Sequence, residues 1–303
     1  MKIDTHVHTH HSGYTSLAPL HRIMRESYND PHAVHAAARA RGMDLVAITD
    51  HDTIGGALEI AHHPDVIVGC EVTARFRDGV RVHLNVLDIT EAQFREIDRA
   101  RHDVSELMPY LRSEGIFVSV NHVASRVTGQ VTAAHVGRLL PWLDGLEVRN
   151  GSRLAVQNRA AVSLAQAGGR VACAGSDSHT MRGIGRTWVE APGATCRTTF
   201  MRELRAGRVT AGGQHGHYFT MASDILRFAA NFYRERFALL IRHPLDWRKH
   251  AVCAGALIGL PLLLVPLALA HGHFRAEARF TESLLLDLVA RPPLLVEPVP
   301  EAA

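Results

Sequence analysis

The stretch RVACAGSDSH, residues 170–179, is an apolar strand-like run that ends in a polar cluster. Upstream runs end in the same way, and their terminal polar residues are His6, Asp50 with His51, Glu71, His122 and Asn150. Helix-patterned segments separate the runs, and this alternation is typical of a mainly parallel sheet, open or closed into a barrel. Active sites in such α/β folds lie at the carboxyl ends of the strands. The pattern therefore predicts an active site at one edge of the sheet.

The alternation can be followed over the first two-thirds of the chain. Apolar runs predict strands at 2–8, 44–49, 66–74, 80–89, 116–122, 145–150 and 170–179. Helical patterns lie between them, at 31–42, 53–62, 91–114, 132–143 and 153–167. Proline in the first turn and glycine at the end delimit the first of these helices.

Composition limits the classes of function. The chain has 303 residues with 47% hydrophobic and 21% charged residues, as in ordinary globular proteins of one barrel-sized domain or two smaller ones. A formal charge of +3 and 6% aromatic residues do not indicate a nucleic-acid partner, and none is expected. The 21 histidines direct attention to a metal site. The four cysteines form no C-x-x-C pair, which favours a reducing compartment, and no signal peptide is expected before the first strand.

Two motifs in the first 52 residues offer imidazole ligands. His6 and His8 lie two apart on a predicted strand, so both side chains point to the same side and can reach one ion. Alternating histidines also occur on solvated strands, so the pair alone decides little. In the run Thr49-Asp50-His51-Asp52, helix capping accounts for one residue but not for the cluster. We interpret Thr53 as the cap and His51 as a ligand.

The other candidate ligands come from later strands. Glu71 lies within the apolar run VIVGCEVTA, where a carboxylate is costly unless it is paired or bound to a cation, so it is a candidate bridge between two metals. His83 lies within VRVHLNVL and His122 follows IFVSV; a lone strand histidine is more often a hydrogen-bonded core residue. Asp177 and His179 leave the last strand two residues apart. Nitrogen and oxygen donors without thiolates favour Mn, Zn or Fe.

These motifs together closely resemble those of the polymerase and histidinol phosphatase (PHP) family. The resemblance covers residues 1–215 and rests on HxH at 6–8, TDH at 49–51, the apolar-flanked Glu71, the strand histidine His83, NH at 121–122 and SDSH at 176–179. It implies an α/β fold, a distorted (β/α)7 barrel with two or three divalent metal ions. By position, His6, His8 and Asp177 would bind the first metal and Glu71 would bridge to the second. His83 and His122 would complete the second, and His51 and His179 would bind a third.

The chain departs from the family pattern at the third metal. The family commonly places an Asp or His in the loop after HxH, and the loop 9–14 of this chain contains no carboxylate. Either His10 or His11 substitutes, or only two ions bind tightly. Val123 also follows His122, where the family commonly has proline.

The resemblance implies a metal-dependent phosphoesterase (a PHP-type phosphatase) that hydrolyses a small phosphomonoester or phosphodiester with a metal-bridging hydroxide. Asp177, His179, His51 and Glu71 would be the catalytic residues. Arg149, Arg153, Arg182 and Arg186 follow strand ends, and one or two of them would bind the substrate, with Arg149 and Arg186 as the first candidates. For each of these arginines alone, a solvated surface position is more typical. One alternative is an amidohydrolase-like C–N hydrolase, disfavoured because binuclear members bridge their ions with lysine and Lys2 is the only lysine in 1–223. Another is a non-catalytic, membrane-tethered module of the same fold.

The last third of the chain has a different character. Residues 216–250 read as a basic amphipathic segment, and 251–270 contain no charge over a length that suits a transmembrane helix, with a buried helix as the alternative. Arginine and lysine are denser before 251–270 than after it, so the catalytic domain is expected in the cytoplasm, anchored to a bacterial inner membrane. The tail 271–303 is expected to be poorly ordered.

Overall fold

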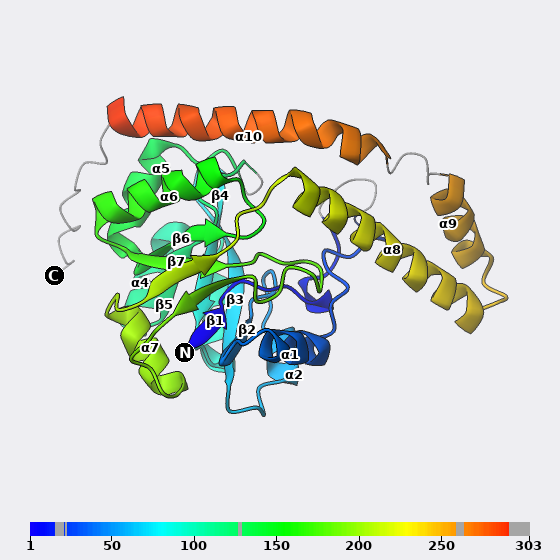
Figure 1. Ribbon diagram of the computed structural model, residues 1–303, viewed down its shortest axis with the longest axis horizontal. Helices are drawn as coiled ribbons and strands as arrows, with labels where there is room; N and C mark the ends of the chain where they lie inside the picture. Colours follow the sequence, from blue (N-terminus) through cyan, green and yellow to red (C-terminus); the bar gives the residue numbers. More distant parts are fainter. Residues whose placement is uncertain (16–20, 22, 127–128, 259–263, 291–303) are drawn as a thin grey trace.

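A sheet of nine strands forms the body of the protein in the computed structural model, which describes residues 1–15, 21, 23–126, 129–258 and 264–290. The strands follow the order β7-β6-β5-β4-β3-β2-β1-β8-β9 across the sheet (Figure 1). Their bounds are β1 (Lys2–Asp4), β2 (Leu45–Ile48), β3 (Val66–Arg75), β4 (Arg81–Leu87), β5 (Phe117–Val120), β6 (Gly145–Asn150), β7 (Val171–Gly175), β8 (Thr187–Glu190) and β9 (Thr210–Gly213).

Most neighbouring strands from β1 to β7 are parallel, and β4 is the exception. β4 pairs antiparallel with both β3 and β5, whereas β1–β2, β2–β3, β5–β6 and β6–β7 are parallel. Only residues 76–80 join β3 to β4, too short a connection for a parallel crossover. The reversal places the beginning of β4, which carries His83, at the carboxyl end of β3.

The sheet curves until its first and seventh strands meet, which makes a nearly closed barrel. Just beyond β1 and β7, Val7 and Ser178 form a parallel bridge, and the backbone N–H of Asp177 donates to the carbonyl of His6 at 2.8 Å. Gly175 makes this approach possible, because a Cβ at that position would lie 2.3 Å from the Cβ of His6. The residues that follow β1 and β7 are therefore brought together.

Helices cover the outside of the barrel. They are α1 (Pro31–Ala40), α2 (Gly55–Glu59), α3 (Glu91–Ala100), α4 (Val104–Ser113), α5 (Ala133–Leu139), α6 (Ala155–Gly168) and α7 (Arg197–Arg205), with short 3-10 turns η1 (His10–Ser12) and η3 (Leu140–Trp142). The expected helix 91–114 is two helices, because the Asp103 side chain accepts a hydrogen bond from Ser105 N and begins a new helix. The predicted α/β barrel architecture is confirmed.

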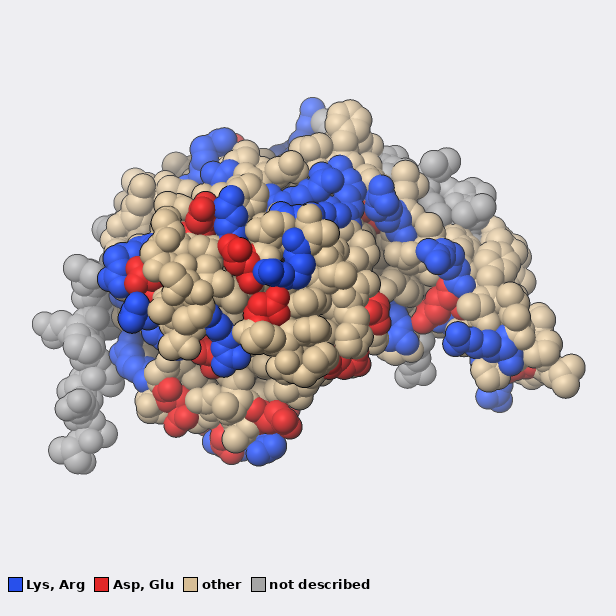
Figure 2. All heavy atoms as spheres, turned by 60° about the horizontal axis from the view of Figure 1, so that its bottom comes forward, with Lys and Arg blue, Asp and Glu red and all other residues tan. Residues whose placement is uncertain are grey.

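Three further helices follow: α8 (Tyr218–Arg242), α9 (Trp247–Ile258) and α10 (Leu264–Ala290). α8 leads away from the barrel to α9, and α10 returns across the barrel beside α5 and α6 (Figure 1). Figure 2 shows lysine and arginine side chains on the projecting arm formed by α8 and α9, at the right of the view.

The predicted hydrophobic helix over 251–270 is not confirmed. Its described residues belong to α9 and α10, and 259–263 lie outside the described part of the chain. Within the residues that the structure describes, none of the helices combines the length and the apolar character required to cross a membrane.

The expectation of a poorly ordered tail is wrong for residues 271–290, which belong to α10. Leu284 and Leu288 of this helix are buried in the main hydrophobic core, so it packs as part of the domain. Glu277 and Thr281 are also buried and bond to the loop after β5. Residues 291–303 lie outside the described residues.

Candidate metal centre

The centre of the site is Glu71, a fully buried carboxylate on β3. Imidazole nitrogens surround its two oxygens, each close enough to share a ligand with it. His6 Nε2 lies 3.2 Å, His8 Nε2 3.3 Å and His51 Nδ1 3.1 Å from Oε2, while His83 Nδ1 and His122 Nε2 each lie 3.1 Å from Oε1. The group thus combines residues that follow β1, β2 and β5 with Glu71 of β3 and His83 of β4.

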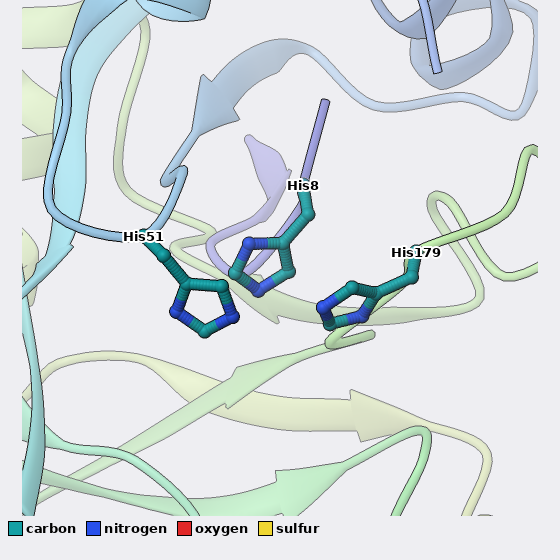
Figure 3. A group of neighbouring side chains, drawn as sticks. All are labelled: His8, His51 and His179. Atoms are coloured by element: carbon teal, nitrogen blue, oxygen red, sulfur yellow. The ribbon is translucent and has the colours of Figure 1, made fainter. Parts of the chain in front are cut away.

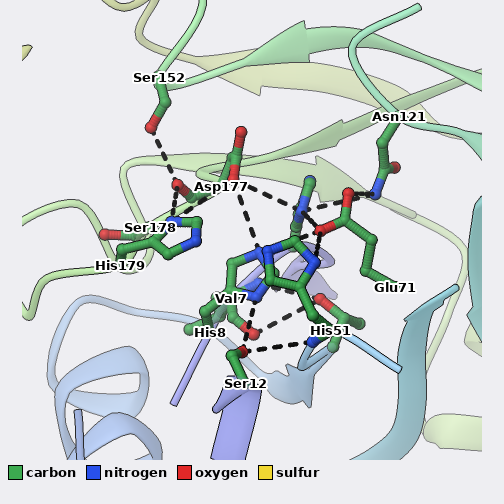
Figure 4. Close-up of polar contacts among 12 residues, drawn as sticks. Val7, His8, Ser12, His51, Glu71, Asn121, Ser152, Asp177, Ser178 and His179 are labelled. Carbon is green, nitrogen blue, oxygen red and sulfur yellow. Dashed lines mark hydrogen bonds and ion pairs between the residues drawn. The ribbon is translucent and has the colours of Figure 1, made fainter. Parts of the chain in front are cut away.

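Asp177 and His179 complete the group from the end of β7. Asp177 Oδ1 lies 3.6 Å from the Nε2 atoms of both His6 and His8. The His179 ring stacks on His8 with a centroid separation of 4.2 Å, and His51 stacks on His8 at 4.4 Å, so the three imidazoles face one another (Figure 3). Figure 4 shows Glu71 and Asp177 approaching these rings from different strands.

Every predicted metal ligand is therefore in one place. Donor atoms within 4.8 Å of one another form the sets His6, His8, Glu71; His6, His122, Asp177; and His8, His51, His179. His10 and His11 do not join them. His11 Nε2 contacts Glu59 Oε1 at 2.7 Å and His10 Nδ1 contacts the Asn29 carbonyl at 3.1 Å. Neither replaces the carboxylate that the family commonly has in this loop.

The donor atoms of this centre fit metal ions. His8 Nε2, Glu71 Oε2 and His83 Nδ1 are buried, and within the described residues they have no hydrogen-bond partner. Buried polar atoms normally have a hydrogen-bond partner, so several buried atoms without one that converge on the same point require another explanation. Divalent cations that accept nitrogen and oxygen ligands provide it, because these ligand types suit Zn, Mn or Fe.

Electrostatics keep the acids charged and two imidazoles neutral. Burial opposes ionisation of Glu71, but the neighbouring imidazoles, His6 above all, hold its pKa well below the usual range. Burial also opposes ionisation of Asp177, and the Arg153 guanidinium holds its pKa well below normal. Burial lowers the pKa of His83 to about 4 and that of His179 well below normal. Neutral imidazole is the form that binds metal.

A second layer of side chains orients the ligands. Glu147 Oε1 accepts a hydrogen bond from His6 Nδ1 at 2.8 Å, which turns Nε2 towards Glu71, and Glu147 Oε2 accepts from the His122 backbone N–H at 3.0 Å. Asn121 Nδ2 donates to Glu71 Oε1 at 2.9 Å. Glu147 was not predicted from the sequence, although a glutamate in the apolar strand GLEVRN is the same signal that identified Glu71.

Backbone strain accompanies the site. His122 and Asp177 have positive φ angles of 30° and 51°, in the left-handed region that disfavours residues with a side chain. Both residues come directly at the end of a strand run, where the turn directs the side chain into the site. Such strain persists only where surrounding contacts hold the backbone in place. Here the backbone N–H of His122 donates to Glu147 and that of Asp177 to the His6 carbonyl.

A cavity of about 770 Å³ opens over the centre. Its wall includes His51, His83, His122, Asp177 and His179, together with Arg75, Arg81, Arg101 and Arg153. Arg149 and Arg186 are not among the lining residues. Arg149 instead donates to the Gly213 carbonyl at 2.9 Å, and Arg186 lines a separate pocket beside Arg41 and Trp188. Of the four arginines considered from the sequence, Arg153 therefore lines the cavity, whereas the two preferred for substrate binding, Arg149 and Arg186, do not.

Residues 156–209 match the PHP-associated family model, and this segment contains Asp177 and His179. This match confirms the resemblance to the PHP family.

Relatives and solved structures add the following. An uncharacterised protein of Methanocaldococcus jannaschii is 32% identical to this chain over 90 residues. The matched segment is 28% of this chain and 52% of the relative, so the chain spans about half the length of that relative. PsfC of Pseudomonas syringae superimposes with a TM-score of 0.52 at 13% identity, over 76% of this chain and 98% of PsfC, which shows a shared fold. A Bifidobacterium adolescentis protein, provisionally described as a metal-dependent phosphoesterase, gives 0.48 at 17% identity over 69% and 96%.

Proposed function

We propose that this chain, as a protein with a PHP-type metal centre, is a metal-dependent phosphoesterase that hydrolyses a phosphomonoester. The observation that carries the proposal is the convergence of imidazoles on the buried Glu71 carboxylate, with Asp177 on the other side. Metal ions held by such ligands can catalyse the hydrolysis of phosphate esters, because they neutralise the negative charge that develops on the phosphoryl oxygens.

Three groups of these side chains would hold the ions. His6, His8, Glu71 and Asp177 would hold one divalent ion, His83 and His122 with Glu71 a second, and His51, His8 and His179 a third. Bound divalent ions polarise phosphoryl oxygens and make water a better nucleophile at neutral pH.

Arg153 and Glu147 would bind the substrate and orient the metal ligands, respectively. Arg153 Nη2 lies 2.9 Å from Asp177 Oδ2 and lines the cavity, so it fixes the carboxylate and presents positive charge to an anionic substrate. Glu147 holds His6 in the tautomer that leaves Nε2 free of a proton. The cavity is large enough for a small phosphorylated molecule.

The test is phosphate release from p-nitrophenyl phosphate by the full chain, reconstituted separately with manganese, zinc and iron(II). We expect metal-dependent turnover that Asp177→Asn lowers by at least about a hundredfold, the scale of losing one essential electrostatic group. Glu190→Gln, on the exposed carboxylate that pairs with Lys2, is the matched control and should keep full activity.

Two outcomes would count against the proposal. A folded protein that binds no divalent ion by calorimetry would refute the metal centre. A metal-loaded protein inert to phosphate esters but active on a cyclic amide would instead favour the amidohydrolase-like alternative.

A further inference from the structure

The cavity over the metal centre has an apolar wall that phosphate binding does not require. Met221, Ile225 and Phe228 of α8 line it, with Tyr14 and Met24 from the loop after β1. Met221, Ile225 and Phe228 are spaced by four and three residues, so they share one face of the helix. The Phe228 ring is held in place by an edge contact with Tyr28 at 5.3 Å. The wall is thus a fixed apolar surface beside the reacting centre.

Another part of the cavity wall is cationic. Arg75 on β3 and Arg81 on β4 are direct cross-strand partners and both line the cavity. Among the described residues, neither guanidinium forms an ion pair with a carboxylate. Two like charges opposite each other destabilise a strand pair unless an anion lies between them. The cavity therefore suits a molecule with an anionic end and an apolar part.

The helix that supplies the apolar wall continues into the exposed arm. Beyond the cavity, Ile241 is 81%, Leu245 96% and Trp247 71% exposed, and residues 218–258 carry six Lys or Arg against three Asp or Glu. An apolar surface interleaved with positive charge is typical of segments that contact amphiphiles with anionic headgroups. One helix therefore joins an apolar wall at the metal centre to an apolar, basic surface outside it.

We propose that the substrate is an amphiphilic phosphomonoester: its phosphate reaches the metal centre while its hydrocarbon tail lies along Met221, Ile225 and Phe228. This inference rests on the proposed function and deepens it from phosphate esters in general to those with an alkyl or prenyl chain. The shared chemistry fits two sources, a lipid in a bilayer or a dissolved amphiphile.

The first experiment measures binding and does not depend on turnover. The full chain, loaded with manganese, is titrated by calorimetry with methyl-, butyl- and octylphosphonate, which resist hydrolysis and stay dissolved at the concentrations used. One buried methylene is worth about 0.8 kcal/mol, about fourfold in affinity. Octylphosphonate should therefore bind on the order of 200-fold more tightly than butylphosphonate if all its additional methylenes are buried. A total gain below about threefold overturns the tail site.

Variants locate the effect. Ile225→Ser should lower the ratio of octylphosphonate to butylphosphonate affinity by about tenfold, because a hydroxyl replaces an apolar contact. Met221→Ser should have the same effect and replaces Ile225→Ser if that variant does not fold. Leu286→Ser, at a position of α10 that is 70% exposed, is the matched control and should keep the full dependence. Equal slopes in wild type and the α8 variants would place the tail elsewhere and overturn the proposal.

The two levels of inference fail differently. If even methylphosphonate does not bind and no aryl phosphate is hydrolysed, the phosphoesterase proposal itself is wrong. If methylphosphonate binds but chain length has no effect, only the tail site is wrong. If chain length does affect binding, sedimentation with phosphatidylcholine vesicles, with and without phosphatidylglycerol, distinguishes a bilayer lipid from a dissolved amphiphile. Binding to the anionic vesicles that Leu245→Ser abolishes identifies a bilayer lipid, and retained chain-length dependence without vesicle binding identifies a dissolved amphiphile.

Discussion

Glu277 anchors α10 to the domain, and its removal gives the sharpest test of how the C-terminal helix supports the site. This buried carboxylate accepts hydrogen bonds through Oε2 from Gln157 Nε2 at 2.6 Å, Ser125 Oγ at 2.9 Å and the Arg126 backbone N–H at 3.1 Å. Glu277→Ala leaves three donors without this acceptor. At roughly 1 to 3 kcal/mol for each unsatisfied group, and with partial relaxation, we expect a loss of about 3 kcal/mol in the free energy of unfolding.

The loss should also reach the metal centre, because Ser125 and Arg126 belong to the loop that begins with His122, and Ser125 N donates to the His122 carbonyl at 2.9 Å. Urea unfolding measures the stability, and manganese calorimetry measures the affinity of the centre. Glu282→Ala, on the exposed side of the same helix, is the matched control and should change neither. If Glu277→Ala unfolds at the same urea concentration as wild type, α10 is not held by this network and the reasoning is refuted.

Three further predictions concern the site and its support. Glu147→Gln, which weakens the hydrogen bond that orients His6, should reduce metal affinity about 10- to 100-fold by calorimetry with little change in melting temperature; unchanged affinity would remove Glu147 from the support of the site. Gly175→Ala should cost about 2 kcal/mol in urea unfolding, because the new Cβ meets the Cβ of His6 at 2.3 Å, whereas Gly255→Ala, with open space around it, should be neutral or stabilising. The hydrogen bond from Ser105, and then the Arg77 guanidinium, lower the pKa of Asp103 to about 2, below its ordinary value of 3.8. A carboxylate whose pKa is lower in the folded state stabilises the protein above the unfolded pKa, so this contribution is complete above pH 4 and is lost as pH falls towards 2. The melting temperature of Asp103→Asn should therefore fall less steeply than that of wild type over this pH interval. Parallel declines of the two melting temperatures would contradict this.

Sequence patterns predicted the strands, and also which side chains gather at the sheet edge, because both depend on local features. An apolar run followed by a polar cluster marks a buried strand and its carboxyl end. Glu71 could be identified because a carboxylate within VIVGCEVTA is costly to bury unless it is paired or bound to a cation. The reversal of β4 was also readable in principle, since Asp78-Gly79 between two apolar runs is a hairpin signal.

The unpredicted parts depend on contacts between distant segments. The length and apolar character of 251–270 favour a membrane helix on hydropathy alone, and nothing local indicates that Leu284 and Leu288 find partners in the core. Three arginines of the cavity wall, Arg75, Arg81 and Arg101, were not predicted for a similar reason. Arg75 and Arg81 meet only through the pairing of β3 with β4, whereas Arg149 follows a strand end but turns to the Gly213 carbonyl.

The meeting of the residues after β1 with those after β7 gives bound metal a mechanical role. His6 and His8 stand near the beginning of the chain and Asp177 far along it, so an ion shared by them is a cross-link that encloses about 170 residues. Like a disulfide across a long loop, such a link restricts the unfolded chain more than any local contact does. Because no fragment that lacks either the His6–His8 segment or Asp177 has the complete ligand set, full metal affinity requires both segments to be in place, and metal binding and folding are coupled.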